Sequence, residues 1–183
     1  MPGEVIQAAV LLLLYHVSDG WHTILIERRK HLKDKHSGQI SFPGGRVDPV
    51  DMSLEDCALR EAREEIGLDT KHVQILGRLT ELYIPVSGFQ VTPVIAHISA
   101  LNSLIPEPAE VASIIHVPLS KLLSENSVKH KVMHLGENLV LPKVPYFDVD
   151  GKVVWGATAM MLSEFLMISR EVIHLKNPGP QMK

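Results

Sequence analysis

The chain has 183 residues, 45% of them hydrophobic and 21% charged, and its formal net charge at pH 7 is −3. That length allows one domain with a sizeable core and is short for two. A slightly negative chain lacks the strongly basic surface that attracts nucleic acid or anionic membranes, so neither is expected as a partner. We expect a single domain over residues 1–183, with its core at about residues 8–173.

The apolar segments and the cysteine content indicate where the chain resides. Its longest apolar run, residues 8–15, is far shorter than the ~20 residues of a membrane-spanning helix. The charged residue that precedes this run is the acidic Glu4, whereas a secretion signal begins with basic residues. Cys57 is the single cysteine, which excludes an internal disulfide, and its helical context predicts a small buried residue. We therefore expect a cytoplasmic protein.

The first part of the chain predicts two paired strands followed by loops. Residues 8–15 form a short continuous apolar run, and residues 18–20 after it have turn-forming side chains. Residues 23–27 predict a second strand that pairs with the first. A basic loop is expected at residues 28–37, and a shaped loop rich in glycine and proline at residues 38–49.

The next segment, residues 53–66, predicts a helix. Ser53 is a good N-cap, and Asp56 three residues later makes a weak capping box with it. Glycine can adopt the left-handed conformation that ends helices without strain, so the helix is expected to stop at Gly67.

Three further strands are predicted at residues 73–82, 89–98 and 111–117. A short helix is predicted at residues 118–123. Residues 129–151 favour irregular hairpins that lead into a strand at residues 152–155. A second long helix is expected at residues 158–173, because apolar side chains recur there at helical spacing, and the tail from Asn177 is expected to be frayed. Strands mixed with two main helices indicate an α/β sandwich with a mixed sheet.

Three carboxylates of the predicted helix point in one direction. Glu61, Glu64 and Glu65 are spaced i, i+3 and i+4, so they fall within about one quadrant of a helical wheel. Like charges ~4 Å apart repel by about 1 kcal/mol in water and by about 4 kcal/mol at an effective dielectric near 20. A hard divalent cation such as Mg²⁺ prefers carboxylate oxygens and would relieve that repulsion. The alternative is a solvated acidic stripe stabilised by Arg60 and Arg63, which lie on the opposite arc.

The loop before this helix gives the three carboxylates a specific context. Gly44 and Gly45 follow Phe42-Pro43, and glycine lets the backbone approach a ligand closely. Together with the sequence REAREEIGL at residues 60–68, they resemble the Nudix box, G-x5-E-x7-R-E-U-x-E-E-x-G-U, where U is aliphatic. The second half of the pattern matches, with alanine at its first aliphatic position.

The first half of the box departs from the pattern. Gly45 and Arg60 are one residue further apart than usual, and the early glutamate is missing. Asp51 is its nearest stand-in and Glu55 a poorer one. This variant resembles the coenzyme A pyrophosphatase branch of the Nudix family.

Other segments are similar to the same branch. Residues 36–45 look like the end of the signature that precedes its box, and Arg29 fits the first arginine of that signature. Asp34 stands where the branch has an arginine, with Lys33 and Lys35 on either side. Three more segments, residues 88–94, 110–119 and 154–159, are also similar to segments of this branch.

The resemblance implies a Nudix-type α/β/α sandwich with a mixed sheet and a metal-dependent hydrolysis of a diphosphate bond. It implies Mg²⁺ or Mn²⁺ as cofactor, with the carboxylates of Glu61, Glu64 and Glu65 and the carbonyl of Gly44 as ligands.

The resemblance also assigns the proton transfer. Glu64 is the expected general base if the base lies in the box, and Glu110 is the candidate if the base lies in a later loop. Arg60 is expected to orient the carboxylates by charge-assisted hydrogen bonds, and the alternative is a surface arginine paired with Asp56.

Substrate contacts are expected from the basic loop and from the glycine pair. The candidates are Arg29, Lys33, Lys35, His36, Gly45 and Phe89. Lysines and arginines of this loop would receive the 3'-phosphate of coenzyme A, although a run of charges is often only a solvated loop. His36 would donate to a phosphate or hold its own loop. Trp155 and Phe89 can stack on an adenine ring, but Trp155 is expected in the core.

Three functions remain open at this stage. The first is hydrolysis of coenzyme A or its acyl derivatives to 3',5'-ADP and 4'-phosphopantetheine or its acyl form. The second is hydrolysis of another nucleoside diphosphate derivative, and the third is a non-catalytic domain that senses such a ligand. The three intact glutamates argue against the third. The expected partner is a small-molecule diphosphate, and the sequence leaves a homodimer open.

Overall fold

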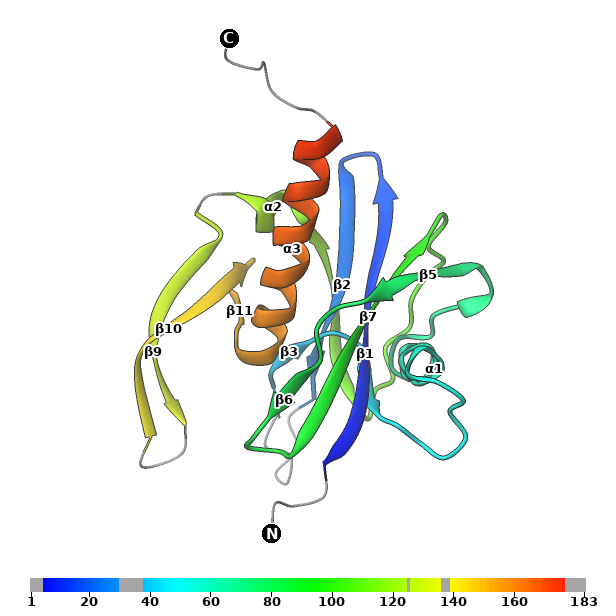
Figure 1. Ribbon diagram of the computed structural model, residues 1–183, viewed down its shortest axis with the longest axis horizontal. Coiled ribbons are helices and arrows are strands. Elements are labelled where there is room, and N and C mark those ends of the chain that lie inside the picture. Colours follow the sequence, from blue (N-terminus) through cyan, green and yellow to red (C-terminus); the bar gives the residue numbers. More distant parts are fainter. Residues whose placement is uncertain (1–4, 30–37, 125, 136–138, 177–183) are drawn as a thin grey trace.

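The computed structural model describes residues 5–29, 38–124, 126–135 and 139–176 (Figure 1). Its main sheet contains β1 (Ile6–Val17), β2 (Gly20–Arg28), β3 (Ile40–Ser41), β4 (Gly44–Arg46), β5 (Val73–Arg78), β6 (Leu82–Ile84), β7 (Phe89–Ile98) and β8 (Val111–Pro118). A second sheet contains β9 (Val128–Leu135), β10 (Leu139–Val149) and β11 (Lys152–Val154). The helices are α1 (Leu54–Ile66), the short 3-10 helix η1 (Thr70–His72), α2 (Leu119–Leu123) and α3 (Gly156–Lys176).

Strand β1 lies at the centre of the main sheet. It runs parallel to β7 and antiparallel to β2 and β4. Ala9 is opposite Gly45 of β4 on one side and Thr92 of β7 on the other. The sheet is therefore mixed, and its central strand carries the short strand β4 that contains the glycine pair.

The two faces of the sheet are covered by different helices. Ala9, Leu11 and Leu13 of β1 pack in a cluster with the buried side chains of α1, whereas Ala8 and Leu12 pack in a cluster with those of α3. Successive side chains of a strand point to opposite faces, so a strand buried on both faces needs a continuous apolar run. Figure 1 shows α1 and α3 on different sides of the strands. The predicted α/β/α sandwich with a mixed sheet is confirmed.

The predicted helix at residues 53–66 is confirmed, but the predicted strand at residues 73–82 is wrong as one element. It consists of β5 and β6, with an irregularity of register between Ile75 and Gly77. Leu79 turns into the cluster on the α3 side, and Glu164 of α3 accepts hydrogen bonds from the backbone and the hydroxyl of Thr80, at 3.0 and 2.8 Å. Contacts with a helix distant in sequence thus interrupt the strand.

The second sheet is more regular than the sequence predicted. Strands β9 and β10 form a long antiparallel pair over much of residues 128–149, with a shift of register between Leu141 and Val144. The loop predicted at residues 38–49 contains the short strands β3 and β4. Helix α3 begins at Gly156, two residues before the predicted start. In the described ranges, no helix is long and apolar enough to span a membrane.

Candidate active site

Helix α1 is fixed at both ends and on its buried face. The Ser53 side chain accepts a hydrogen bond from the backbone of Asp56, and Gly67 ends the helix in the left-handed conformation with φ 64°. Cys57, a free thiol, is fully buried against the sheet, as the sequence predicted. Burial raises the pKa of this thiol to about 11, so it stays protonated at neutral pH. The helix therefore presents its carboxylates from a rigid base.

Gly44 lies directly against the central strand. Its φ is 151°, and a Cβ atom there would come within 2.4 Å of the Ala9 carbonyl oxygen and 2.5 Å of the Val10 Cα. These are backbone atoms, so they do not move aside as a side chain would. The preceding residue, Pro43, accepts a 2.8 Å hydrogen bond from the Leu11 amide. The position therefore requires glycine.

Glu65 is a buried carboxylate held by this glycine. Its side chain is 2% exposed, and one oxygen accepts a 2.8 Å hydrogen bond from the Gly44 amide. The other oxygen lies 3.6 Å from Nη1 of Arg28. Burial raises the pKa of Glu65 to about 7, against the opposing influence of the Gly44 amide and Arg28. Ionised Glu65 is thus poorly compensated, and a cation near it would restore the balance.

Glu61 lies over Gly45. A Cβ atom on Gly45 would be 2.6 Å from both Cδ and Oε1 of Glu61 and 2.7 Å from its Oε2. The second glycine therefore leaves the space that the carboxylate occupies. Burial raises the pKa of Glu61, while Arg60 acts to lower it. Both carboxylates at the glycine pair are consequently partly desolvated acids.

Arg60 connects the helix to the loop before it. Its Nε and Nη2 donate to the two oxygens of Asp51 at 2.8 and 2.9 Å, and its Nη1 donates to Glu61 and Glu64 at 2.9 and 3.0 Å. Nη2 also donates to the carbonyl of Arg46. The side chains of Arg60 and Asp51 are 16% and 2% exposed. The arginine holds the pKa of Asp51 at about 2, so the pair is ionised at neutral pH.

The helical wheel placed Arg60 on the solvated side of the helix, and this prediction is wrong for its charged end, which is mostly buried against Asp51. A long side chain reaches across the helix, so the wheel angle of its Cα does not fix the position of its charged end. The alternative pairing with Asp56 is wrong, because the partner on the loop is Asp51. Asp51 is the residue that the sequence offered as stand-in for the missing early glutamate.

The other two candidate carboxylates lie at the margin of the site. The side chain of Glu64 is 54% exposed. Glu110 is exposed in the turn just before β8, and its charge acts to raise the pKa of both Glu61 and Glu65. The carbonyl oxygen of Glu110 accepts a 2.7 Å hydrogen bond from the Arg29 amide, which brings this loop to the end of β2.

The structure brings only some of the predicted substrate residues together. Gly45 adjoins Glu61, and exposed Arg29 adjoins Glu110 through the backbone. Phe89 packs instead against the cluster on the α3 side of the sheet, away from the face that carries α1. Lys33, Lys35 and His36 lie outside the described residues.

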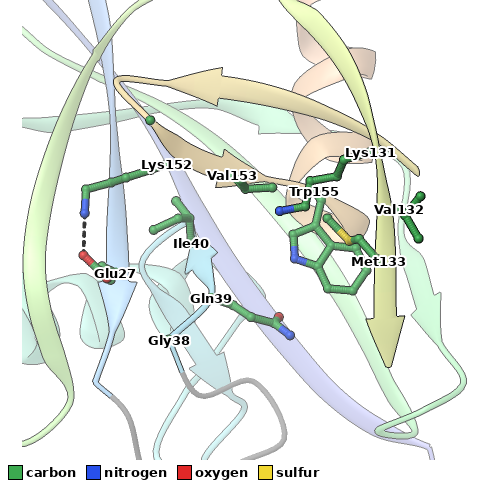
Figure 2. Close-up of a pocket in the computed structure, with 11 residues that line it drawn as sticks. Glu27, Gly38, Gln39, Ile40, Lys131, Val132, Met133, Lys152, Val153 and Trp155 are labelled. Carbon is green, nitrogen blue, oxygen red and sulfur yellow. Dashed lines mark hydrogen bonds and ion pairs between the residues drawn. The ribbon is translucent and has the colours of Figure 1, made fainter. Parts of the chain in front are cut away.

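Two features of the structure were not found from the sequence. The bond from the Gly44 amide to Glu65 joins residues 21 positions apart, and no local pattern indicates it. Trp155 was expected in the core, but it is only partly buried and lines an open cleft (Figure 2). The expectation fails because β11 ends at Val154, so Trp155 projects from the short connection to α3.

The carboxylates are suited to a hard cation, although they do not form a finished cage. In the parts of the chain that the structure describes, no group of three or more His, Cys, Asp or Glu side chains stands ready to hold a metal. Glu61 and Glu64 both contact Arg60 instead. The carboxylates near Gly44 and Gly45 nevertheless supply oxygen donors; Glu65 is buried, Glu61 is partly buried, and burial raises the pKa of both. This chemistry fits Mg²⁺ or Mn²⁺.

A model of a known protein family matches the chain. The NUDIX domain model covers residues 5–135. The chain belongs to the Nudix hydrolase family. Its relatives include two proteins named Nudix hydrolase NudL. The one from Photorhabdus laumondii is 38% identical over 143 residues, which are 78% of this chain and 74% of the relative. The one from Pectobacterium atrosepticum is 35% identical over 162 residues, which are 88% and 81% of the two chains.

Solved Nudix structures share the fold. The Nudix hydrolase RenU of M. smegmatis superposes with a TM-score of 0.58 at 17% identity, over 98% of this chain and 90% of that one. The Ap4A hydrolase of C. elegans gives a TM-score of 0.55 at 18% identity, over 65% and 84%. The enzyme class predicted from the box is thereby confirmed: the chain is a Nudix hydrolase that acts on a diphosphate substrate.

Proposed function

We propose that this Nudix hydrolase splits the diphosphate bond of coenzyme A or its acyl derivatives, with Mg²⁺ or Mn²⁺ as cofactor. The products are 3',5'-ADP and 4'-phosphopantetheine or its acyl form. The observation that carries the metal-dependent chemistry is the approach of partly buried Glu61 and buried Glu65 to the backbone of Gly44 and Gly45. The choice of coenzyme A rests on residues 36–45 and on the early part of the box, where Asp51 replaces the usual glutamate and pairs with Arg60.

The carboxylates of Glu61, Glu64 and Glu65 and the carbonyl of Gly44 would hold the cation. When bound, a divalent cation lowers the pKa of a bound water and neutralises charge on the phosphoryl oxygens. Support for this assignment comes from the buried position of Glu65, the partly buried position of Glu61 and the raised pKa of both.

The protein's own residues position the carboxylates and accept the proton. Arg60 donates to Glu61 and Glu64 from the same nitrogen, and Asp51 fixes the arginine from the other side. Glu64 is the most exposed of the three glutamates, so it is the one that can meet the attacking water and take its proton. Glu110 is the second candidate for this role, since it lies close enough to influence both Glu61 and Glu65.

The remaining parts of the proposal concern binding and location. Arg29 and Gly45 are the described residues assigned to the phosphates, and Lys33, Lys35 and His36 of the same loop stay predictions. Cytoplasmic residence and a homodimer also stay predictions.

A second candidate is hydrolysis of another nucleoside diphosphate derivative. The Nudix domain of NrtR from Shewanella oneidensis, solved as a complex with ADP ribose, superposes with a TM-score of 0.51 at 19% identity, over 66% of this chain and 77% of that one. A fold of this kind therefore accommodates an adenosine diphosphate derivative, and such compounds belong in the test.

The test is incubation of the purified protein with coenzyme A, NADH, ADP-ribose and ADP-glucose, each with Mg²⁺ or Mn²⁺, and separation of the products by chromatography. We expect 3',5'-ADP and 4'-phosphopantetheine from coenzyme A at the highest kcat/KM. Preference for ADP-ribose would replace coenzyme A by the second candidate. Failure to cleave any of the four would contradict the proposal for all these substrate classes.

A further inference from the structure

An open cleft lies between the edge of the main sheet and the second sheet, on the far side of β2 from the glutamates. Its volume is about 480 Å³, within the range of small-molecule sites. Figure 2 shows side chains from β2, β9 and β11 and from the residues beside β3 around it. The lining residues that matter here are Glu27, Gln39, Lys131, Met133, Lys152 and Trp155.

The cleft is separate from the site on α1. Glu27 and Arg28 are neighbours at the end of β2, so their side chains point to opposite faces of the sheet. Arg28 reaches Glu65 on the α1 side, whereas Glu27 pairs with Lys152 of β11, with 2.5 Å between Oε2 and Nζ. The carboxylates carried by α1 therefore lie on one face of the sheet, and the cleft opens on the other, around the edge formed by β3.

The cleft offers an aromatic face. Trp155 is partly buried and follows fully buried Val154, and Figure 2 shows its indole within the cleft beside Met133, with the Gln39 amide in the same opening. An indole face stacks on a planar ring such as a nucleotide base.

The cleft also has an excess of positive charge. Lys152 is neutralised by Glu27, which in addition accepts a hydrogen bond from Ser113. Lys131 lies with its ammonium group 5.7 Å from the centroid of the Tyr146 ring, a contact that does not neutralise it. One ammonium group beside an aromatic face favours a ligand that joins a planar ring to an anion.

We propose that this cleft binds an adenosine phosphate, with Trp155 stacked on the base and Lys131 on the phosphate. Two sources share this chemistry. One is the nucleotide end of the substrate, which would reach the cleft by passing around β3. This first source rests on the proposed function. The other is a separate nucleotide, such as the product 3',5'-ADP.

Binding is tested without metal, so it does not depend on turnover. In Trp21→Phe, Trp155 is the single tryptophan of the chain, and titration with 3',5'-ADP in EDTA should change its fluorescence saturably. Lys131→Ala in the same background should weaken binding at least tenfold. Lys129→Ala, two residues earlier on β9 and paired with Asp148 outside the cleft, should leave it unchanged. Absence of a saturable change, or equal affinity in the two lysine variants, would overturn the proposal.

Kinetics then separate the two sources. If the cleft holds the nucleotide end of the substrate, Lys131→Ala should raise KM for coenzyme A with kcat unchanged. If a separate nucleotide binds there, KM should stay as in the parent while 3',5'-ADP binding is weakened. Failure of the chain to cleave coenzyme A would refute the proposed function, but the fluorescence titration would still decide the binding site.

Discussion

Glu61 and Glu65 owe their properties to the two glycines beneath them. The Gly44 amide donates a hydrogen bond to Glu65, and the Gly44 backbone packs closely against β1. Gly45 only leaves room for the Glu61 side chain. Glycine is therefore required at these two adjacent positions for different reasons. Gly44 is needed for the packing of the fold, and Gly45 for the space that the Glu61 carboxylate occupies. Their substitution by alanine should separate these reasons.

Gly45→Ala should reduce hydrolysis of the substrate at least about tenfold, because the new methyl group displaces the Glu61 carboxylate. The carboxylate is the end of a side chain and can move, so the free energy of unfolding should change little. Gly44→Ala should instead destabilise the fold by about 3 kcal/mol or more, through overlap with Ala9 and a positive φ. Denaturant unfolding and activity of both variants check this, and equal destabilisation would contradict it.

Glu65 makes the stability of the metal-free protein depend on pH. Its pKa is raised from 4.5 to about 7 in the folded state, so the folded chain holds this proton over a range in which the unfolded chain has lost it. The contribution of Glu65 to the free energy of unfolding should therefore fall as pH rises from 4.5 to about 7.

Denaturant unfolding of the wild type and Glu65→Gln in EDTA, across this pH range, measures the effect. Glutamine keeps an acceptor for the Gly44 amide but does not titrate, so this fall should be missing from the variant. The same pH dependence in both proteins would show that Glu65 titrates near its ordinary pKa.

Glu64→Gln should lower kcat a hundredfold or more, the scale of a lost general base or metal ligand. The matched control is Asp56→Asn on the same helix, because Asp56 is exposed and its bond to Ser53 uses only the backbone. Steady-state kinetics with saturating Mg²⁺ measure both variants. Near-normal turnover by Glu64→Gln would refute the role of Glu64 and turn attention to Glu110.

At the scale of elements, α1 is the part of the molecule that local sequence specifies best. Ser53, Gly67 and the buried small residues lie within one continuous segment, so caps and periodicity predict its bounds. The position of Arg60 was not predictable in this way, because its partner Asp51 belongs to the preceding loop. The break between β5 and β6 depends on Glu164, 84 residues after Thr80.

The N-cap of α1 is open to a direct test. Ser53→Ala removes the hydrogen bond to the Asp56 amide and should lower the free energy of unfolding by about 1 kcal/mol. Ser53→Asp keeps an oxygen acceptor and should retain most of the stability. Denaturant unfolding compares the variants, and equal stability of Ser53→Ala and wild type would show that the cap contributes nothing.

At the scale of the whole molecule, two helices on opposite faces of one sheet serve different purposes. Helix α1 carries the carboxylates over β4, while α3 packs on the other face, and the cleft is lined by the edge of the main sheet, the second sheet and Trp155 just before α3. The sandwich follows from the continuous apolar β1, which needs cover on both faces. The cleft was not predictable, since it depends on how β11 meets β2 through Lys152 and Glu27, 125 residues apart.

The central claim is that the carboxylates at the glycine pair form a divalent cation site. Titration with Mn²⁺, followed by the electron paramagnetic resonance of the free ion, measures this directly. The double variant Glu61→Gln/Glu65→Gln should bind Mn²⁺ at least about tenfold more weakly than wild type, and Asp56→Asn should bind it as wild type does. Unchanged Mn²⁺ affinity in the double variant would contradict the claim.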